Sequence, residues 1–167
     1  MIGCFSLSHS TGATGSKPAM SAPVCAPVLP NEFTALVVDD NPIVLKCTAE
    51  MLQELGYRIH TAGEGGEALA RLRQWPCHLL LTDYEMPGIN GWELAQAAKS
   101  HSIGLRTVIM TGNCQADVAH LMSDRHIDGW LFKPFRMEHL EEMLASIGLP
   151  LCSARRTRVV KEFKNNA

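Results

Sequence analysis

The sequence predicts an α/β domain in which a doubly wound, five-stranded parallel sheet carries helices on both faces. Between residues 33 and 150, short apolar runs alternate with amphipathic stretches, and this alternation is typical of β-α-β units. The apolar runs are continuous, so the strands are expected to be buried on both faces, as parallel strands are. Apolar residues make up 46% of the chain, which excludes wholesale disorder. No run reaches the roughly 18 apolar residues of a membrane-spanning helix.

Five strands and five helices follow from these patterns. The strands are expected at residues 36–38, 57–62, 79–81, 107–110 and 130–132, and the helices at 42–55, 67–74, 91–100, 116–125 and 137–147. Asn41 precedes Pro42, which is a capping residue followed by proline at the first helical position. Asn90 and Glu93 have the spacing of a capping box. The helix at 116–125 has the weakest pattern of the five.

Charge and composition divide the chain into three parts. Residues 1–32 are rich in Ser, Gly, Thr, Ala and Pro, and we expect a flexible leader or linker there because little apolar surface can be buried. Residues 33–150 form the expected folded domain, and residues 31–151 carry nine basic and sixteen acidic side chains, a net charge of −7. Residues 151–167 form a basic tail with five basic side chains and one acidic side chain.

The cysteines and the N-terminus bear on the cellular location. None of the six cysteines forms a CxxC pair, so reduced thiols are expected rather than a disulfide framework or a zinc finger. The first ten residues lack the basic region and the sustained apolar region of a secretory signal. We therefore expect a cytoplasmic protein without membrane contact.

Polar residues at the carboxyl ends of the apolar strands suggest a site. Asp39 and Asp40 follow the first strand, Asp83 the third, Thr111 the fourth and Lys133 the fifth. Open α/β sheets build their sites at these strand ends. Three converging carboxylates repel one another unless a cation neutralises them, and carboxylate oxygens suit Mg²⁺. Together with a hydroxyl and an ammonium, they are the groups that hold a phosphoryl group during its transfer.

These residues lie in motifs that resemble the receiver domain of bacterial two-component response regulators. The similarity extends over about residues 33–148 and keeps the family's order of motifs. The matching segments are Leu36–Asp40, Asp83–Gly91, Thr111–Gly112 and Trp130–Phe135. The resemblance implies a flavodoxin-like sheet with the strand order 2-1-3-4-5.

The resemblance also implies roles in phosphoryl transfer. Asp83 would accept a phosphoryl group from a histidine kinase or a phosphotransfer protein. Asp39 and Asp40 would hold Mg²⁺ together with Asp83 and the backbone carbonyl of Glu85. These roles come from the family's motifs, matched residue by residue to this sequence.

The remaining matches concern a conformational switch. Thr111 would hydrogen-bond one phosphoryl oxygen, and Lys133 would pair with another. Trp130, three residues before Lys133, would be a switch aromatic that turns inward when Thr111 moves toward the phosphate. The Lys133–Pro134 peptide bond is expected to be cis. Output is expected through the face of the fourth helix, fifth strand and fifth helix, which could also form a homodimer.

The sequence therefore predicts a phosphoacceptor in histidine–aspartate signalling, either a stand-alone regulator or a receiver separated from a hybrid kinase. It would catalyse only its own phosphorylation and dephosphorylation, and no direct binding to DNA is expected. One alternative is a Mg²⁺-dependent phosphatase that forms an aspartyl-phosphate. Such an enzyme needs an aspartate two residues after its nucleophile, where this chain has Glu85. The other is a receiver-like module that binds partners without being phosphorylated.

A second metal site can be drawn in the predicted fourth helix. Its residues would be Cys114, Asp117, His120 and Asp124. Such clusters arise readily from composition, so we favour a polar helix face over a metal site.

Overall fold

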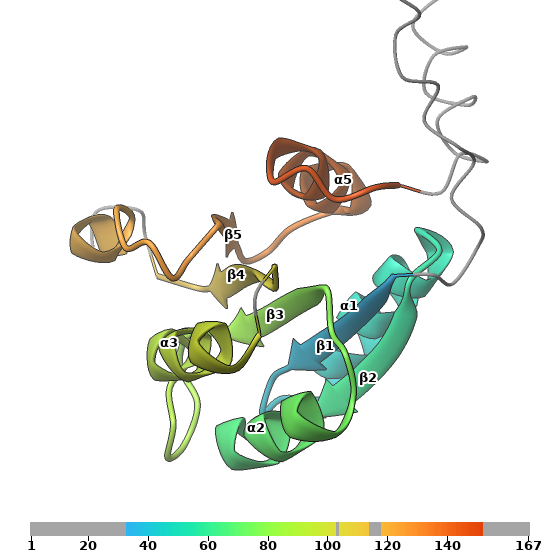
Figure 1. Ribbon diagram of the computed structural model, residues 1–167. Helices are drawn as coiled ribbons and strands as arrows, with labels where there is room; N and C mark the ends of the chain where they lie inside the picture. The colour runs from blue at the N-terminus through green and yellow to red at the C-terminus, as the bar shows by residue number, and fades with distance from the viewer. Residues whose placement is uncertain (1–32, 103, 114–117, 152–167) are drawn as a thin grey trace, which may run out of the picture.

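Five parallel strands form one sheet in the order β2-β1-β3-β4-β5, as Figure 1 shows, which confirms the predicted fold class and strand order. The computed structural model describes residues 33–102, 104–113 and 118–151. The strands are β1 (Thr34–Val38), β2 (Arg58–Ala62), β3 (Leu79–Asp83), β4 (Arg106–Thr111) and β5 (Gly129–Phe132). The α-helices are α1 (Pro42–Glu54), α2 (Gly65–Gln74), α3 (Gly91–His101) and α5 (Met137–Ser146).

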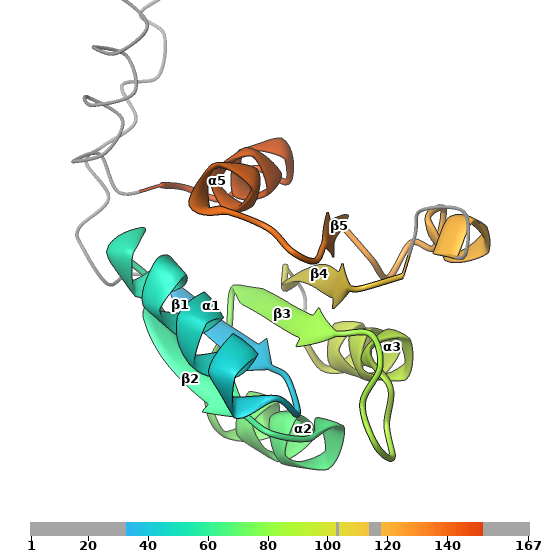
Figure 2. The ribbon, with the colours of Figure 1, turned by 180° about the vertical axis from the view of Figure 1, so that it is seen from behind.

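Helices cover the sheet on both sides because successive strand residues face opposite ways. Val37 and Leu81 belong to a buried cluster with α1 and α5, and Leu36 and Leu80 belong to another with α2 and α3. The two views of the ribbon in Figures 1 and 2 show α1 and α5 apart from α2 and α3. The continuous apolar runs are therefore strands buried on both faces, as predicted.

The local signals for two helix starts are confirmed. The Asn41 side chain accepts a hydrogen bond of 3.0 Å from the backbone N–H of Ile43 at the start of α1. At the start of α3, Asn90 and Glu93 exchange both hydrogen bonds of a capping box. These caps fix where each helix begins beside the carboxyl end of the preceding strand.

The predicted helix at 116–125 is wrong after Val118, which is its one α-helical residue in the part that the structure describes. Residues 114–117 lie outside the described ranges, and the following segment contains a short 3₁₀ helix, η1 (Ala119–Leu121). The backbone N–H of Ile127 then bonds to the carbonyl of Asp124 at 3.1 Å. The Asp124 side chain accepts from the N–H of His126 at 2.8 Å. This side-chain bond stabilises a turn in competition with a helix.

Candidate functional site

The strand register brings the predicted site residues to one edge of the sheet. Val38 pairs with Thr82, so Asp39 and Asp83 follow on adjacent strands. Thr111 pairs with Phe132, and Lys133 comes directly after β5. The carboxyl ends of parallel strands meet at the same edge, so these side chains converge there.

One lysine joins two of the three carboxylates. The Lys133 ammonium Nζ lies 2.7 Å from Asp39 Oδ2 and 2.9 Å from Asp83 Oδ1. The Asp39 side chain is fully buried, whereas Asp40 is exposed. Oxygen atoms of Asp39, Asp40 and Asp83 all lie within 4.8 Å of one another. Three carboxylates and one ammonium leave the pocket with an excess of negative charge.

The electrostatics of the pocket follow from burial and from this pairing. Burial raises the pKa of the Asp83 carboxyl, and the hydrogen bond and charge of Lys133 only partly offset that effect. Burial alone would lower the pKa of Lys133, but its hydrogen bonds to Asp39 and Asp83 raise it. The ammonium is therefore kept charged, while the negative charge on Asp83 is held in an unfavourable place.

Backbone groups hold the two buried carboxylates in position. Asp83 Oδ1 accepts from the N–H of Tyr84 at 2.9 Å, and Asp39 Oδ1 accepts from the N–H of Asn41 at 2.9 Å. Close approach of the chain adds a constraint at Gly91, where a Cβ would collide with the carbonyl oxygen of Asp83. Only glycine lets the first turn of α3 pass so near the acidic residue.

Thr111 and Glu85 are linked through a residue that the sequence analysis did not single out. Thr111 is buried, and its hydroxyl accepts from the backbone N–H of Asn113 at 3.0 Å. The Asn113 side-chain amide donates to Glu85 Oε1 at 3.1 Å. Asn113 thus connects the loop after β3 with the loop after β4 beside the pocket. No sequence pattern signals such a contact between residues 28 positions apart.

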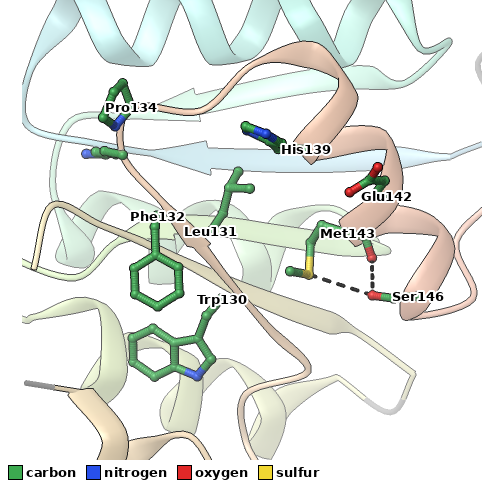
Figure 3. A pocket seen from close by; sticks show the side chains of 9 residues that line it. Trp130, Leu131, Phe132, Pro134, His139, Glu142, Met143 and Ser146 are labelled. Atoms are coloured by element: carbon green, nitrogen blue, oxygen red, sulfur yellow. Dashed lines mark hydrogen bonds between the residues drawn. The ribbon is translucent and has the colours of Figure 1, made fainter. Parts of the chain in front are cut away.

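Trp130 lies inside the protein. It is 8% exposed and belongs to a buried cluster with Ile109 and Val118. Its ring centroid is 6.2 Å from that of Tyr84, which follows Asp83 directly. Trp130 and Phe132 lie on one side of β5, and Leu131 points to the other, as Figure 3 shows. The indole Nε1 of Trp130 is buried and has no hydrogen-bond partner among the described residues.

Asp124, which the sequence offered as a ligand of a second metal site, instead bonds to Trp92 and His126. Asp124 accepts from Trp92 Nε1 at 2.7 Å and lies 2.7 Å from His126 Nδ1. Cys114 and Asp117 fall outside the described residues. Within the described ranges, the one group of three acidic, histidine or cysteine side chains spaced to hold a metal is Asp39, Asp40 and Asp83. The Lys133–Pro134 bond is cis, as predicted.

Comparison with known proteins identifies the class. The family model of the response regulator receiver domain matches residues 35–145. The chain belongs to this family. It is a receiver domain of two-component signalling, the phosphoacceptor class, and neither alternative from the sequence analysis is favoured.

Relatives and solved structures agree with this assignment. The chain is 32% identical over 115 residues to the sensor histidine kinase RcsC of Salmonella typhi, a match that covers 69% of this chain and 12% of that protein. The chemotaxis protein CheY4 of Vibrio cholerae has a similar fold, with a TM-score of 0.64, 27% identity and coverage of 69% and 98% of the two chains. The response regulator TrrA of Thermotoga maritima, solved with Mg²⁺ and BeF, is also similar in fold, with a TM-score of 0.62 and 31% sequence identity. The match covers 69% of this chain and 98% of TrrA.

The match to RcsC is local. The chain spans about one eighth of the length of that kinase, since 12% of it is covered. In the part of the chain that the structure describes, no helix is both long and apolar enough to cross a membrane.

Proposed function

We propose that Asp83 accepts a phosphoryl group from the phosphohistidine of a kinase or phosphotransfer protein in the cytoplasm, with Mg²⁺ bound at the pocket. The geometry of the Asp83 carboxylate carries this proposal. Its Oδ1 is fixed by the N–H of Tyr84 and the ammonium of Lys133, each at 2.9 Å. No described residue donates a hydrogen bond to Oδ2. One oxygen is thus anchored, and the other is left to act as nucleophile.

The donor set of the pocket fits a magnesium ion. Asp39, Asp40 and Asp83 offer carboxylate oxygens within 4.8 Å of one another, and such oxygens are the protein ligands that Mg²⁺ prefers. The backbone carbonyl of Glu85 is the proposed fourth ligand, by resemblance to the family. When bound, Mg²⁺ neutralises charge on the incoming phosphoryl group. The solved structure of TrrA with Mg²⁺ and BeF supports this assignment.

The proposed transfer is a displacement at phosphorus. Asp83 Oδ2 forms a bond to phosphorus while the phosphorus–nitrogen bond of the donor breaks, and the imidazole leaves with that electron pair. The Lys133 ammonium, which already contacts Asp83, compensates charge on one phosphoryl oxygen, and the Thr111 hydroxyl donates to another. The signal ends by hydrolysis: water attacks phosphorus, inorganic phosphate leaves and the Asp83 carboxylate is restored. These are the only reactions that we assign to the chain.

An apolar groove beside the pocket supports a protein as the donor. It has a volume of about 410 Å³ and is lined by residues of α1 and of the chain after β5: Ile43, Val44, Cys47, Thr48, Met51, Lys133, Pro134 and Phe135. Ile43 is 72% exposed, although it is a large apolar side chain. A small phosphodonor has no use for such a surface, whereas a helical phosphotransfer protein could bury it. We therefore place the donor on α1.

We propose that the switch runs from Thr111 to Trp130. A phosphoryl group on Asp83 draws the Thr111 hydroxyl toward it, which competes with the resting contact from Asn113 at 3.0 Å. The space beside β5 then changes shape, and Trp130 repacks against Tyr84. We further propose that residues 33–150 constitute this signalling unit, flanked by the leader 1–32 and the tail 151–167. DNA binding is not part of the proposed function.

The test is phosphorylation by acetyl phosphate with Mg²⁺, followed by intact mass spectrometry. One added phosphoryl group, labile to hydroxylamine, is expected on the unaltered chain. Asp83→Asn is expected to abolish it, because the amide oxygen is a poor nucleophile. Glu50→Gln changes an exposed carboxylate on α1 and serves as the matched control, which should be labelled like the unaltered chain. Undiminished labelling of Asp83→Asn would overturn the assignment.

A further inference from the structure

Trp92 joins the first turn of α3 to the chain between β4 and β5. Its indole Nε1–H donates to Asp124 Oδ2 at 2.7 Å, although the two residues are 32 positions apart. The other carboxylate oxygen of Asp124 accepts from the backbone N–H of His126 at 2.8 Å. The bonds from His126 and Trp92 lower the pKa of Asp124 to about 2. The carboxylate is therefore charged at neutral pH, and the bond from the indole is charge-assisted. Figures 1 and 2 show this part of the chain, in orange, next to α3.

The first turn of α3 is held against the acidic pocket. The N–H of Gly91 bonds to the carbonyl of Tyr84 at 3.0 Å, and the N–H of Tyr84 bonds to Asp83 Oδ1 at 2.9 Å. A Cβ at position 91 would collide with the carbonyl oxygen of Asp83, so this turn packs directly on the backbone of Asp83. Trp92 follows Gly91 in the chain. Its hydrogen bond to Asp124 therefore connects the pocket with the chain between β4 and β5.

Residues 118–127 pack on Trp130. Val118 and Ile127 are buried in one apolar cluster with Trp130, and Leu121 and Met122 pack against the same cluster. A protein interior is packed too densely for a large ring to turn unless a neighbouring part of the chain moves. Repacking of Trp130 therefore requires a shift of residues 118–127, and any bond that holds these residues in place opposes it.

Two indoles of this cluster differ in how their N–H groups are satisfied. The Nε1 of Trp130 is buried and has no hydrogen-bond partner among the described residues, which is unfavourable for a polar group inside a protein. The indole of Trp92, which packs against the same cluster, has a charged acceptor in Asp124. The unpaired N–H shows that the position of Trp130 is not its most favourable one. Other contacts of the cluster must hold it there, and the bond between Trp92 and Asp124 is suited to do so.

We propose that the hydrogen bond from Trp92 to Asp124 is a latch that holds residues 118–127 on Trp130 in the unphosphorylated state and opens when Asp83 is phosphorylated. Trp92 is then a positioning residue, which acts on the switch through Asp124 and does not touch the phosphoryl group. This inference rests on the proposed function, because it concerns the proposed movement of Trp130. It adds a second connection from the pocket, through the first turn of α3, to the one through Thr111.

The affinity for a phosphoryl mimic distinguishes a latch from a structural contact. A bond that exists only in the unphosphorylated state lowers the affinity for a ligand that favours the other state. Removal of such a bond should therefore tighten the binding of the mimic. A hydrogen bond that is present in both states would contribute to the stability of the fold, but its removal would leave this affinity unchanged.

Calorimetric titration of the full chain with beryllofluoride and Mg²⁺ tests the latch. Trp92→Phe removes the donor and Asp124→Ala the acceptor, and each should tighten beryllofluoride binding about tenfold, the order expected for one charge-assisted hydrogen bond. The double variant should bind no tighter than either single variant, because both changes remove the same bond. Trp75→Phe changes an exposed tryptophan that stacks on His60 and should bind like the unaltered chain. Unchanged or weaker binding by Trp92→Phe and Asp124→Ala would overturn the proposal.

A measurement on the unaltered chain does not depend on the folding of any latch variant. Proton–nitrogen NMR spectra resolve the indole N–H groups of the three tryptophans. With beryllofluoride bound, the indole N–H of Trp92 should exchange with water about tenfold faster, because the latch is open. Unchanged exchange at full occupancy would contradict the latch.

The same titrations separate this proposal from the proposed function. If beryllofluoride does not bind the unaltered chain, or binds Asp83→Asn equally well, the proposed function fails and the latch fails with it. If beryllofluoride binds at Asp83 with the same affinity in the unaltered chain, Trp92→Phe and Asp124→Ala, only the latch is overturned.

Discussion

The carboxylates at the two ends of the strands have opposite balances of charge around them. Before β5, Asp128 contacts Lys99 Nζ at 2.6 Å and Arg106 at 3.0 Å and accepts from the N–H of Thr107 at 2.8 Å. At the carboxyl ends of the strands, three aspartates lie within 4.8 Å of one another, and two of them, Asp39 and Asp83, contact the ammonium of Lys133. One end therefore has a single carboxylate with two cations, whereas the other end has three carboxylates with one cation.

The pKa values of the carboxyl groups follow this difference. Burial alone would raise the pKa of Asp128, but the hydrogen bonds from Lys99, Thr107 and Arg106 lower it below its usual range. For Asp83, burial raises the pKa and the single lysine does not reverse the shift. Asp128 therefore stabilises the native state in its charged form. The cluster around Asp83 keeps an uncompensated charge, which prepares it for a cation and a phosphoryl group.

The largest effect on stability is expected from a substitution of Asp128. Asp128→Ala should lower the free energy of unfolding by about 2–4 kcal/mol, because it leaves the Thr107 N–H and the half-buried Lys99 without their acceptor. Urea unfolding measures this change. Asp128→Asn, which keeps an acceptor oxygen, should lose less. A loss below about 0.5 kcal/mol for Asp128→Ala would show that this end of the sheet does not depend on the cluster.

Changes in the acidic pocket should have the opposite sign. Without divalent cations, Asp83→Asn or Asp40→Asn should raise the stability by about 0.5–1.5 kcal/mol, because each removes like-charge repulsion. Mg²⁺ should stabilise the unaltered chain by mass action and should stabilise these variants less. Thermal unfolding with and without MgCl₂ measures both effects. If both variants melt lower than the unaltered chain without metal, these aspartates are structural.

Asp124 is another carboxylate with a lowered pKa, and the dependence of stability on acid pH tests it. Hydrogen bonds from the backbone of His126 and from the Trp92 indole lower the pKa of Asp124 to about 2, against about 3.9 in an unfolded chain. A lowered pKa in the native state contributes stability that is complete above the unfolded value and is lost as the pH falls toward 2. Between pH 5 and 2, Asp124→Asn should therefore lose less stability than the unaltered chain. Parallel curves would show that the Asp124 contacts are not formed in solution.

The smallest expected effect is the optical signal of Trp130. In a variant with Trp75→Phe and Trp92→Phe, Trp130 is the single tryptophan of the three in the chain. A stable phosphoryl mimic with Mg²⁺ should change its emission and its access to a quencher, because Thr111 moves beside it. Mass spectrometry of the complex confirms occupancy of the site. An unchanged emission at full occupancy would show that Trp130 is a packing residue and would contradict the proposed route to the output face.

Local signals explain which parts could be predicted from the sequence. The cap at Asn41 and the capping box at Asn90 act within a few residues, so their pattern is visible in the chain. The convergence of Asp39, Asp83 and Lys133 was also accessible, because parallel strands bring their carboxyl ends to one edge and the family's motifs fix the order. No structure was needed to expect these residues near one another.

The missed features depend on contacts between distant residues. Asp128 meets Lys99 across 29 positions, and Trp92 meets Asp124 across 32. Neither pair has a periodic pattern that could announce it. The predicted helix at 116–125 is wrong after Val118 for a related reason, since Asp124 bonds to the backbone of His126 and to Trp92 and so favours a turn over a helix. Tertiary partners decided the conformation there.

The chain enters and leaves the domain at one corner. Phe33 and Leu151 pack against the same buried cluster. Phe33 also accepts from the N–H of Arg58 at 2.8 Å, and the Tyr57 hydroxyl donates to Pro150 at 2.8 Å. A unit whose two ends are neighbours can be inserted into a longer polypeptide with little separation between the flanking segments. This architecture suits recombination as a self-contained cassette, consistent with relatives in which the matching part is 12% of a large kinase.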